Sequence, residues 1–255
     1  MCMPKVRSKA VFAALSISLM GLGHAADAAV VLLSEFRDTF ASASVNTSIG
    51  SESASSSRNS SGDFSDFDDS VAVGVSLGAA SASASAQQTS QISTTSISAS
   101  GMATANAEIT PFDPSFFTVA SASANTGLSV SFELTTPQLF DLSGALSSDP
   151  GTFSFGQAGV SLNSQDGSFS LSLSTPFFGA QTTPFDLSGT LFPNIYTLTA
   201  NANIGANAFS EEAVSGTTDF SFALHFSAVP IPAAFWLFGT GLIGLAGFAK
   251  TRKIA

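Results

Sequence analysis

The chain has 255 residues, a formal net charge of −10 and only 10% charged residues, so it is long enough for one globular body but poor in ionic side chains. Six of its eight basic residues lie in the two terminal segments, and residues 29–249 hold two Arg against 17 acidic residues. Such a body cannot neutralise a run of phosphates, which excludes nucleic acid as a partner. The single cysteine, Cys2, precedes the first apolar stretch, so the rest of the chain has no disulfide.

The first 28 residues have the layout of a secretory signal peptide. Three basic residues precede an apolar stretch of 14 residues, 10–23, which is followed by small residues. Ala26-Asp27-Ala28 offers a cleavage site that would leave Ala29 as the first mature residue, and Gly23-His24-Ala25 offers another. The sequence predicts a signal peptide over 1–28 and therefore export; an N-terminal membrane anchor is the alternative.

Residues 29–228 alternate large apolar side chains with small or polar ones, which is the period of strands with one buried face. The clearest runs are Leu128–Phe132, Phe169–Leu173 and Phe220–Phe226. Turn signals lie at 125–127, 149–151, 165–167 and 193–194. Residues 151–174, which follow the turn at 149–151, are predicted to form a hairpin with its own turn at 165–167. Short strands at this spacing, with 24 Phe to fill a core, predict an all-β body, an antiparallel β-sandwich or jelly roll.

The region 40–107 is different, because it consists largely of Ser and Ala. Side chains this small bury little area per strand. One hypothesis is that long strands over Val71–Ala86 and Ser90–Glu108 pair across the sandwich, and the other is a low-complexity stalk. Under either hypothesis, we expect Ser51–Asp69 to be a mobile loop.

A short internal repeat occurs in the second half of the body. Phe140-Asp141-Leu142-Ser143-Gly144-Ala145-Leu146 recurs 45 residues later as Phe185-Asp186-Leu187-Ser188-Gly189-Thr190-Leu191. One pair of copies is too few for a solenoid. It predicts two similar strands, each closed by a turn, with Asp141 and Asp186 either capping those turns or binding a cation.

The last 27 residues, 229–255, predict a membrane segment. Ile231–Ala249 contains 19 residues without a charge, and a helix of that length spans roughly 28 Å, close to the thickness of a bilayer core. The basic residues after it predict a cytoplasmic tail, with the body on the other side of the membrane. Within the helix, three glycines share one face and could allow close helix contact. The tail residues are Lys250, Arg252 and Lys253, and the glycines are Gly241, Gly244 and Gly247.

The segment that begins at Val229 resembles the PEP-CTERM sorting signal, in particular its V-P-L-P-A variant. The resemblance lies in the order of an entry motif, an apolar helix and a basic tail, and the commoner form has Glu where Ile231 stands. The motif residues are Val229, Pro230, Ile231, Pro232 and Ala233. The resemblance implies processing by an exosortase-type membrane protease at the inner membrane of a Gram-negative bacterium, often alongside exopolysaccharide or biofilm production. The two prolines also keep the backbone before the helix extended, as a protease requires.

Three motifs suggest chemistry in the chain, and each is weak. Gly74-Val75-Ser76-Leu77-Gly78 matches a nucleophile elbow, but strand-like alternation surrounds it and the one mature His is His225. A dinucleotide-type glycine motif at 239–244 lies inside the apolar segment, where no βαβ unit can form. Four carboxylates in seven residues fall short of an EF-hand and are weak calcium candidates: Asp63, Asp66, Asp68 and Asp69. We expect no zinc and no cofactor.

Three functions follow from these patterns. The first is an exported, non-enzymatic surface or matrix protein, briefly anchored in the inner membrane with its body in the periplasm and then released to the cell surface or extracellular matrix. The second is a carbohydrate- or calcium-binding β-sandwich delivered by the same route. The third is a secreted hydrolase that uses Ser76 and His225.

Overall fold

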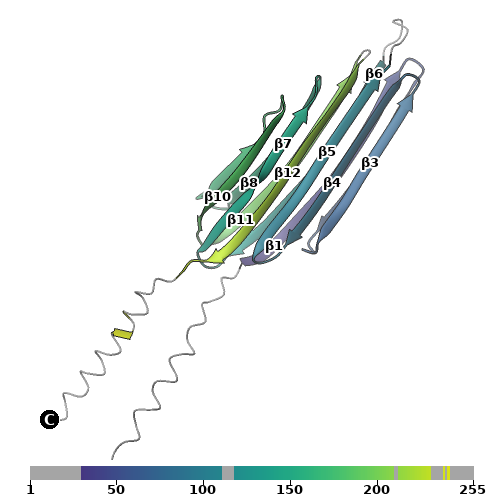
Figure 1. Ribbon diagram of the computed structural model, residues 1–255. Helices are drawn as coiled ribbons and strands as arrows, with labels where there is room; N and C mark the ends of the chain where they lie inside the picture. The colour runs from purple at the N-terminus through teal and green to yellow at the C-terminus, as the bar shows by residue number, and fades with distance from the viewer. Residues whose placement is uncertain (1–29, 111–117, 210–211, 231–237, 239, 242–255) are drawn as a thin grey trace, which may run out of the picture.

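The computed structural model describes residues 30–110, 118–209, 212–230, 238 and 240–241. These residues form twelve strands, stacked as two antiparallel six-stranded sheets (Figure 1). The predicted all-β class and the sandwich are therefore confirmed for the described part of the chain. The strands are long, up to 18 residues in the first of them.

The strands are, in chain order, β1 (Val30–Thr47), β2 (Gly50–Ser61), β3 (Phe67–Leu77), β4 (Ala80–Ile92), β5 (Ser96–Ile109), β6 (Thr118–Leu134), β7 (Gln138–Pro150), β8 (Ser154–Ser164), β9 (Ser170–Ser174), β10 (Gln181–Leu191), β11 (Asn194–Ala208) and β12 (Ala213–Ala228). Sheet A has the order β2-β1-β6-β11-β8-β9, and sheet B has the order β10-β7-β12-β5-β4-β3. Edge strands β2 and β3 therefore lie on one side of the sandwich, and β9 and β10 are the edges at the other ends of the two sheets.

One half of the interior is filled by Phe, Leu and Val, as the alternation predicts. Phe132, on β6, is fully buried, stacks on Tyr196 of β11 and meets Phe226 of β12 edge-on, with ring centroids 5.8 and 5.1 Å away. The Tyr196 hydroxyl donates to the carbonyl oxygen of Phe192 at 2.9 Å, so this buried polar atom is satisfied. Aromatic contacts of this kind join the two sheets.

The other half of the interior is lined mostly by alanine, contributed by β1, β4, β5, β6 and β11, with a few Val and Ile. Cα atoms of β1 and β4, and of β5 and β6, approach within 8 Å, which is closer than the ~10 Å usual for stacked sheets. Methyl side chains allow this approach, so small residues still exclude water between two long sheets. The Ser/Ala region is thus part of the folded core, and the stalk hypothesis is wrong.

Three details of that region differ from the sequence predictions. The expected strand Val71–Ala86 is divided by a turn at Gly78 and Ala79, where Gly78 has a φ of 62°. Strands β4 and β5 pair side by side in sheet B instead of facing each other across the sandwich. Ser51–Asp69, expected to be a loop, contains β2 and the beginning of β3, because the backbone of β2 pairs with β1 along its whole length and needs no large side chain to do so.

The predicted hairpin over 151–174 is confirmed, since β8 and β9 pair around a turn at 165–169. The Asp166 carboxylate accepts hydrogen bonds from the Ser168 backbone N–H at 2.9 Å and from the Ser164 hydroxyl at 2.8 Å, and the bonds from Ser168 are the main reason that the pKa of Asp166 lies far below its ordinary value. The turns expected near 150 and 193 are also present. The turn expected at 125–127 is wrong, because these residues lie in the middle of β6, paired with β1 and β11.

The two copies of the repeat pair with each other. Strands β7 and β10 are antiparallel, with Leu142 opposite Leu187 at the centre. Phe140 lies opposite Gly189, and Phe185 lies opposite Gly144, so the phenyl ring of each copy covers the glycine of the other. A Cβ added at Gly144 would meet the Phe185 ring and the backbone of Ser221, which explains why the repeat contains glycine. Neither repeat aspartate caps a turn; both are exposed in mid-strand.

Candidate functional site

The start and the end of the described body lie at the same end of the sandwich. Val30 is opposite Leu134 on β6, and Ala228 is opposite Gln138 on β7, where both partner strands meet the short connection 135–137. In Figure 1 the beginning of β1 and the end of β12 lie at this end of the sheets. Val229 and Pro230 are exposed beyond the last strand. The first strand therefore begins, and the last strand ends, at the same end of the two sheets.

Much of the predicted sorting segment lies outside the described residues. Of the motif, Ile231, Pro232 and Ala233 are outside, as are Gly244, Gly247 and the three basic residues of the tail. Gly241 is described, and a Cβ placed on it would contact nothing within 4 Å. No helix among the described residues is long and apolar enough to cross a membrane.

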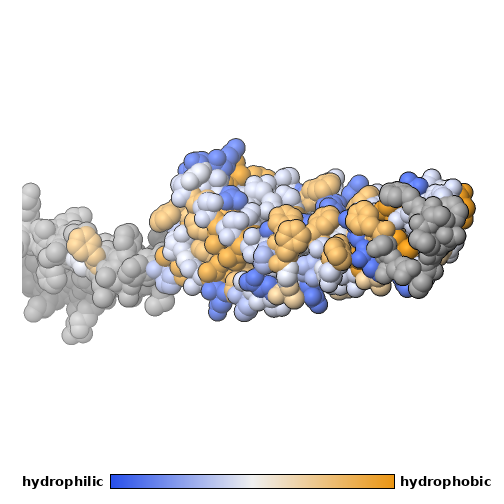
Figure 2. Space-filling model, turned by 90° about the horizontal axis from the view of Figure 1, so that it is seen from above, coloured by the Kyte–Doolittle hydropathy of each residue, from blue (hydrophilic) through white to orange (hydrophobic). Residues whose placement is uncertain are grey.

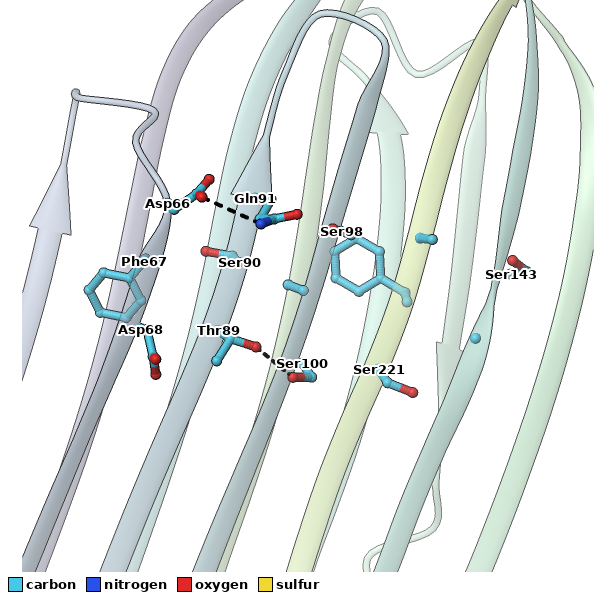
Figure 3. Close-up of a pocket in the computed structure, with 14 residues that line it drawn as sticks. Asp66, Phe67, Asp68, Thr89, Ser90, Gln91, Ser98, Ser100, Ser143 and Ser221 are labelled. Carbon is cyan, nitrogen blue, oxygen red and sulfur yellow. Dashed lines mark hydrogen bonds between the residues drawn. The ribbon is translucent and has the colours of Figure 1, made fainter.

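The outer face of sheet B carries a shallow hollow of about 700 Å³. Strands β3, β4, β5, β7 and β12 contribute to it, and Figure 3 shows its labelled side chains projecting from neighbouring strands. A second hollow of about 390 Å³ shares four residues with it. We call the combined depression the sheet B trough, and its characteristic side chains are Asp66, Asp68, Thr89, Gln91, Ser100 and Ser221.

Hydrogen bonds between strands fix several trough side chains. The Thr89 and Ser100 hydroxyls lie 2.8 Å apart, and the Gln91 amide donates to Asp66 at 3.4 Å (Figure 3). Asp219 lines the second hollow, where burial raises the pKa of its carboxyl, although a hydrogen bond from Ser147 acts in the opposite direction. The trough therefore offers short hydroxyl, amide and carboxylate groups on a rigid sheet, without an exposed aromatic platform among its lining residues.

The four weak calcium candidates do not converge on one point. Asp63 accepts hydrogen bonds from the Ser65 hydroxyl and backbone N–H, at 2.7 and 2.8 Å, which lower its pKa. Asp68 and Asp69 are consecutive strand residues, so their side chains point to opposite faces of β3. Among the described residues, no three acidic, His or Cys side chains are grouped to hold a metal ion.

The two residues of the hydrolase hypothesis are far apart. Ser76 is opposite Ser81, beside the turn at the far end of the sandwich, and it is followed by a strand instead of the helix that a nucleophile elbow requires. His225 is exposed on β12, near the end of the body, where it lies opposite Ser96 on β5 and Asp141 on β7. No pattern in the sequence indicated that Ser96, His225 and Asp141 lie side by side, and no hydrogen bond joins the three side chains in the described part of the chain.

Sequence analysis also missed a buried ion pair. Glu35 and Arg37, on β1, point into the sandwich, their side chains are fully buried, and Arg37 Nε lies 3.1 Å from Glu35 Oε2. The guanidinium also lies over the Phe67 ring, 5.5 Å from its centroid. Their position in the sequence contained the signal, because they occupy the same alternate positions as Thr39, Ala41 and Ala43, which are buried.

The outer surface is otherwise weakly polar. Figure 2 shows a surface that is mostly pale, with several apolar patches and few strongly hydrophilic residues. Exposed large apolar side chains include Ile49, Phe153, Phe177, Phe178, Phe192 and Phe209. This surface agrees with the low content of charged residues.

Comparisons with known proteins leave the family open. No protein family and no curated protein matches the chain. A solved structure, the enzymatically active domain of bacteriophage CBA120 tailspike protein 4, is similar over 56% of this chain, with 17% sequence identity and a TM-score of 0.26. The matched part is 19% of the tailspike chain. The class of fold comes from the strands themselves, which form a two-sheet β-sandwich.

Proposed function

We propose that this protein is an exported, non-enzymatic surface or matrix protein, delivered and processed through its C-terminal segment by an exosortase-type membrane protease. Its body would stand in the periplasm while the apolar segment 231–249 holds it at the inner membrane, and would then pass to the cell surface or to an exopolysaccharide matrix. The observation that carries the proposal is that Val30 and Ala228 lie at the same end of a long sandwich.

This geometry suits a protein held by one end. Strand β12 has 16 residues and ends just before the Pro motif, and a strand of that length spans roughly 50 Å. A signal peptide before Val30 and an anchor after Pro230 would then leave the opposite end, with its turns at 48–49 and 78–79, farthest from the membrane. Val229 and Pro230 are exposed, so a protease can reach the backbone at the junction.

The processing step is tested by mass spectrometry of both ends of the protein isolated from its own host. We expect the wild type to begin near Ala29 and to have lost the basic tail, whereas a variant with Pro230→Ala and Pro232→Ala keeps Ala255 and remains in the membrane fraction. Pro184→Ala, at an exposed position on β10, is the matched control and should be processed normally. A wild-type protein with an intact C-terminus would refute the sorting role.

A second candidate function is binding of a neutral polysaccharide in the sheet B trough. The rows of hydroxyl, amide and carboxylate groups that line it are suitable partners for sugar hydroxyls, while the absence of an aromatic platform among them predicts weak binding. Affinity electrophoresis in gels that contain the exopolysaccharide of the host, or dextran, would measure it. We expect Ser221→Arg to weaken retardation about tenfold, and Thr199→Arg, on the outer face of sheet A, to leave it unchanged. Equal retardation of both variants would exclude the trough.

A further inference from the structure

The β2/β3 side of the sandwich presents two long unpaired strand edges. Strand β2 is the edge of sheet A and β3 is the edge of sheet B, with 12 and 11 residues. The other two edges are protected, since β9 has only five residues and β10 contains Pro184. Natural sheets commonly protect their edges in these ways, so an edge without short length or proline is a candidate for strand pairing.

The turns define which backbone groups of these edges are free. Strands β1 and β2 are joined by two residues, with Thr47 opposite Gly50, and β3 and β4 are joined in the same way, with Leu77 opposite Ala80. The pair that flanks a two-residue turn is hydrogen-bonded, and hydrogen-bonded pairs alternate along an antiparallel ladder. The free N–H and C=O groups therefore belong to odd-numbered residues of β2 and even-numbered residues of β3.

A two-fold axis satisfies both edges at once. An antiparallel copy of β2 centred on Ser55 pairs Ser53 with Ser57 of the second copy. Both residues are odd-numbered, so their free backbone N–H and C=O groups face each other. A copy of β3 centred on Ala72 pairs Ser70 with Gly74 of the second copy, which joins even to even. Ser55 and Ala72 each lie five residues from the turn-flanking residues Gly50 and Leu77. Those two lie together, because a Cβ on Gly50 would be 3.6 Å from Leu77. One axis through Ser55 and Ala72 therefore serves both sheets.

The charges agree with this register. With Ser55 on the axis, Glu52 of each copy lies directly opposite Arg58 of the other, at positions where the strands are not hydrogen-bonded and side chains are closest. Within the described residues, neither side chain forms an ion pair. Arg58 is also one of only two basic residues between Ala29 and Ala249. On β3, the same register places the half-buried Val73 of each copy opposite Val71 of the other, and Val75 opposite Asp69.

We propose that two copies of this chain pair through the β2/β3 side, with β2 against β2 and β3 against β3, so that each six-stranded sheet becomes a continuous twelve-stranded sheet. The partner is a second copy because the same two strands supply both halves of each complementary pair. The two-fold symmetry closes the interface, so the product is a dimer and not a fibre.

Site-directed cross-linking of the protein produced in its own host tests the register. In a Cys2→Ser background, which leaves no other cysteine, Ser55→Cys places two thiols across the axis, whose Cα atoms would be about 5.5 Å apart. A short bismaleimide should then give a covalent dimer. Ser53→Cys is the matched control: its two thiols would be displaced by four residues, about 14 Å along the strands, and should not react. Equal cross-linking at both positions, or none at Ser55→Cys, would overturn the proposal.

Charge exchange tests the ion pairs in the Ser55→Cys background. Arg58→Glu alone places like charges opposite each other and should lower the dimer fraction by a factor on the order of five or more. Adding Glu52→Arg to Arg58→Glu restores opposite charges and should restore cross-linking, which a loss of fold would not. If the double exchange remains as poorly cross-linked as the single one while both keep the wild-type melting temperature, Glu52 and Arg58 do not meet.

Discussion

Replacing Arg37 by Ala should lower the free energy of unfolding by about 3–5 kcal/mol, because it leaves a buried carboxylate without its partner. Arg37 and Glu35 are fully buried, and Nε lies 3.1 Å from Oε2 at an angle outside that of a hydrogen bond. Among the described residues, neither Nη atom of Arg37 has a hydrogen-bond partner in the protein. The guanidinium therefore depends on Glu35 and the Phe67 ring for its compensation.

The intact pair of Glu35 and Arg37 contributes much less to the free energy of unfolding than is lost when only one partner is removed. A double replacement, Glu35→Leu with Arg37→Met, removes both charges and keeps apolar volume, so we expect it to be near neutral or stabilising. Urea unfolding followed by circular dichroism would measure each variant. Glu108→Ala is the control for the loss of one charge, since that side chain is exposed on β5, and should change stability by no more than about 0.5 kcal/mol. If Arg37→Ala lowers the free energy of unfolding by less than about 1 kcal/mol, the Glu35 carboxylate is stabilised in the interior without Arg37.

Replacing Phe132 by Ala should cost about 3–5 kcal/mol, the range for large aromatic side chains removed from a core. The ring is 0% exposed and packs between Tyr196 of β11 and Phe226 of β12, so its removal leaves a cavity that joins both sheets. The strands on either side are held by their ladders, which limits collapse into that cavity.

The melting temperature is the direct measurement. For a body of about 200 residues each kcal/mol corresponds to roughly 2–4 °C, so the expected decrease is on the order of 6–20 °C. Phe155→Ala removes the same side chain from an exposed position on β8 and should change the melting temperature far less. Equal decreases for the two variants would contradict the assignment of Phe132 to the core.

The predictions that succeeded rest on local periodicity. Alternation in Phe220–Phe226 and Leu128–Phe132 identified strands and their buried faces, because successive side chains of a strand point to opposite faces whatever the partner strand is. The hairpin around Asp166 was also predictable, since its turn is closed by residues within a few positions of one another. The hydrolase hypothesis depends on whether Ser76 and His225 lie close together in space. Alternation along the chain gives no information about that distance.

The predictions that failed involve the choice of partner strand. Ser51–Asp69 has too little apolar content to signal a strand, yet β2 forms because β1 is beside it and supplies backbone hydrogen bonds. Asn125-Thr126-Gly127 has the composition of a turn, but neighbours on both sides hold it extended in β6. Tertiary pairing overrides local propensity in both cases.

The amino-acid sequence by itself determined the all-β class, the buried face of most strands and the acidic, cysteine-free character of the body, because composition and a period of two are local properties. Only the tertiary structure decided that the repeat copies pair with each other, that alanine-lined sheets approach closely, that Glu35 and Arg37 are enclosed, and that the β2/β3 side has free edges. Each of these depends on contacts between residues distant in the chain, which a linear pattern does not specify.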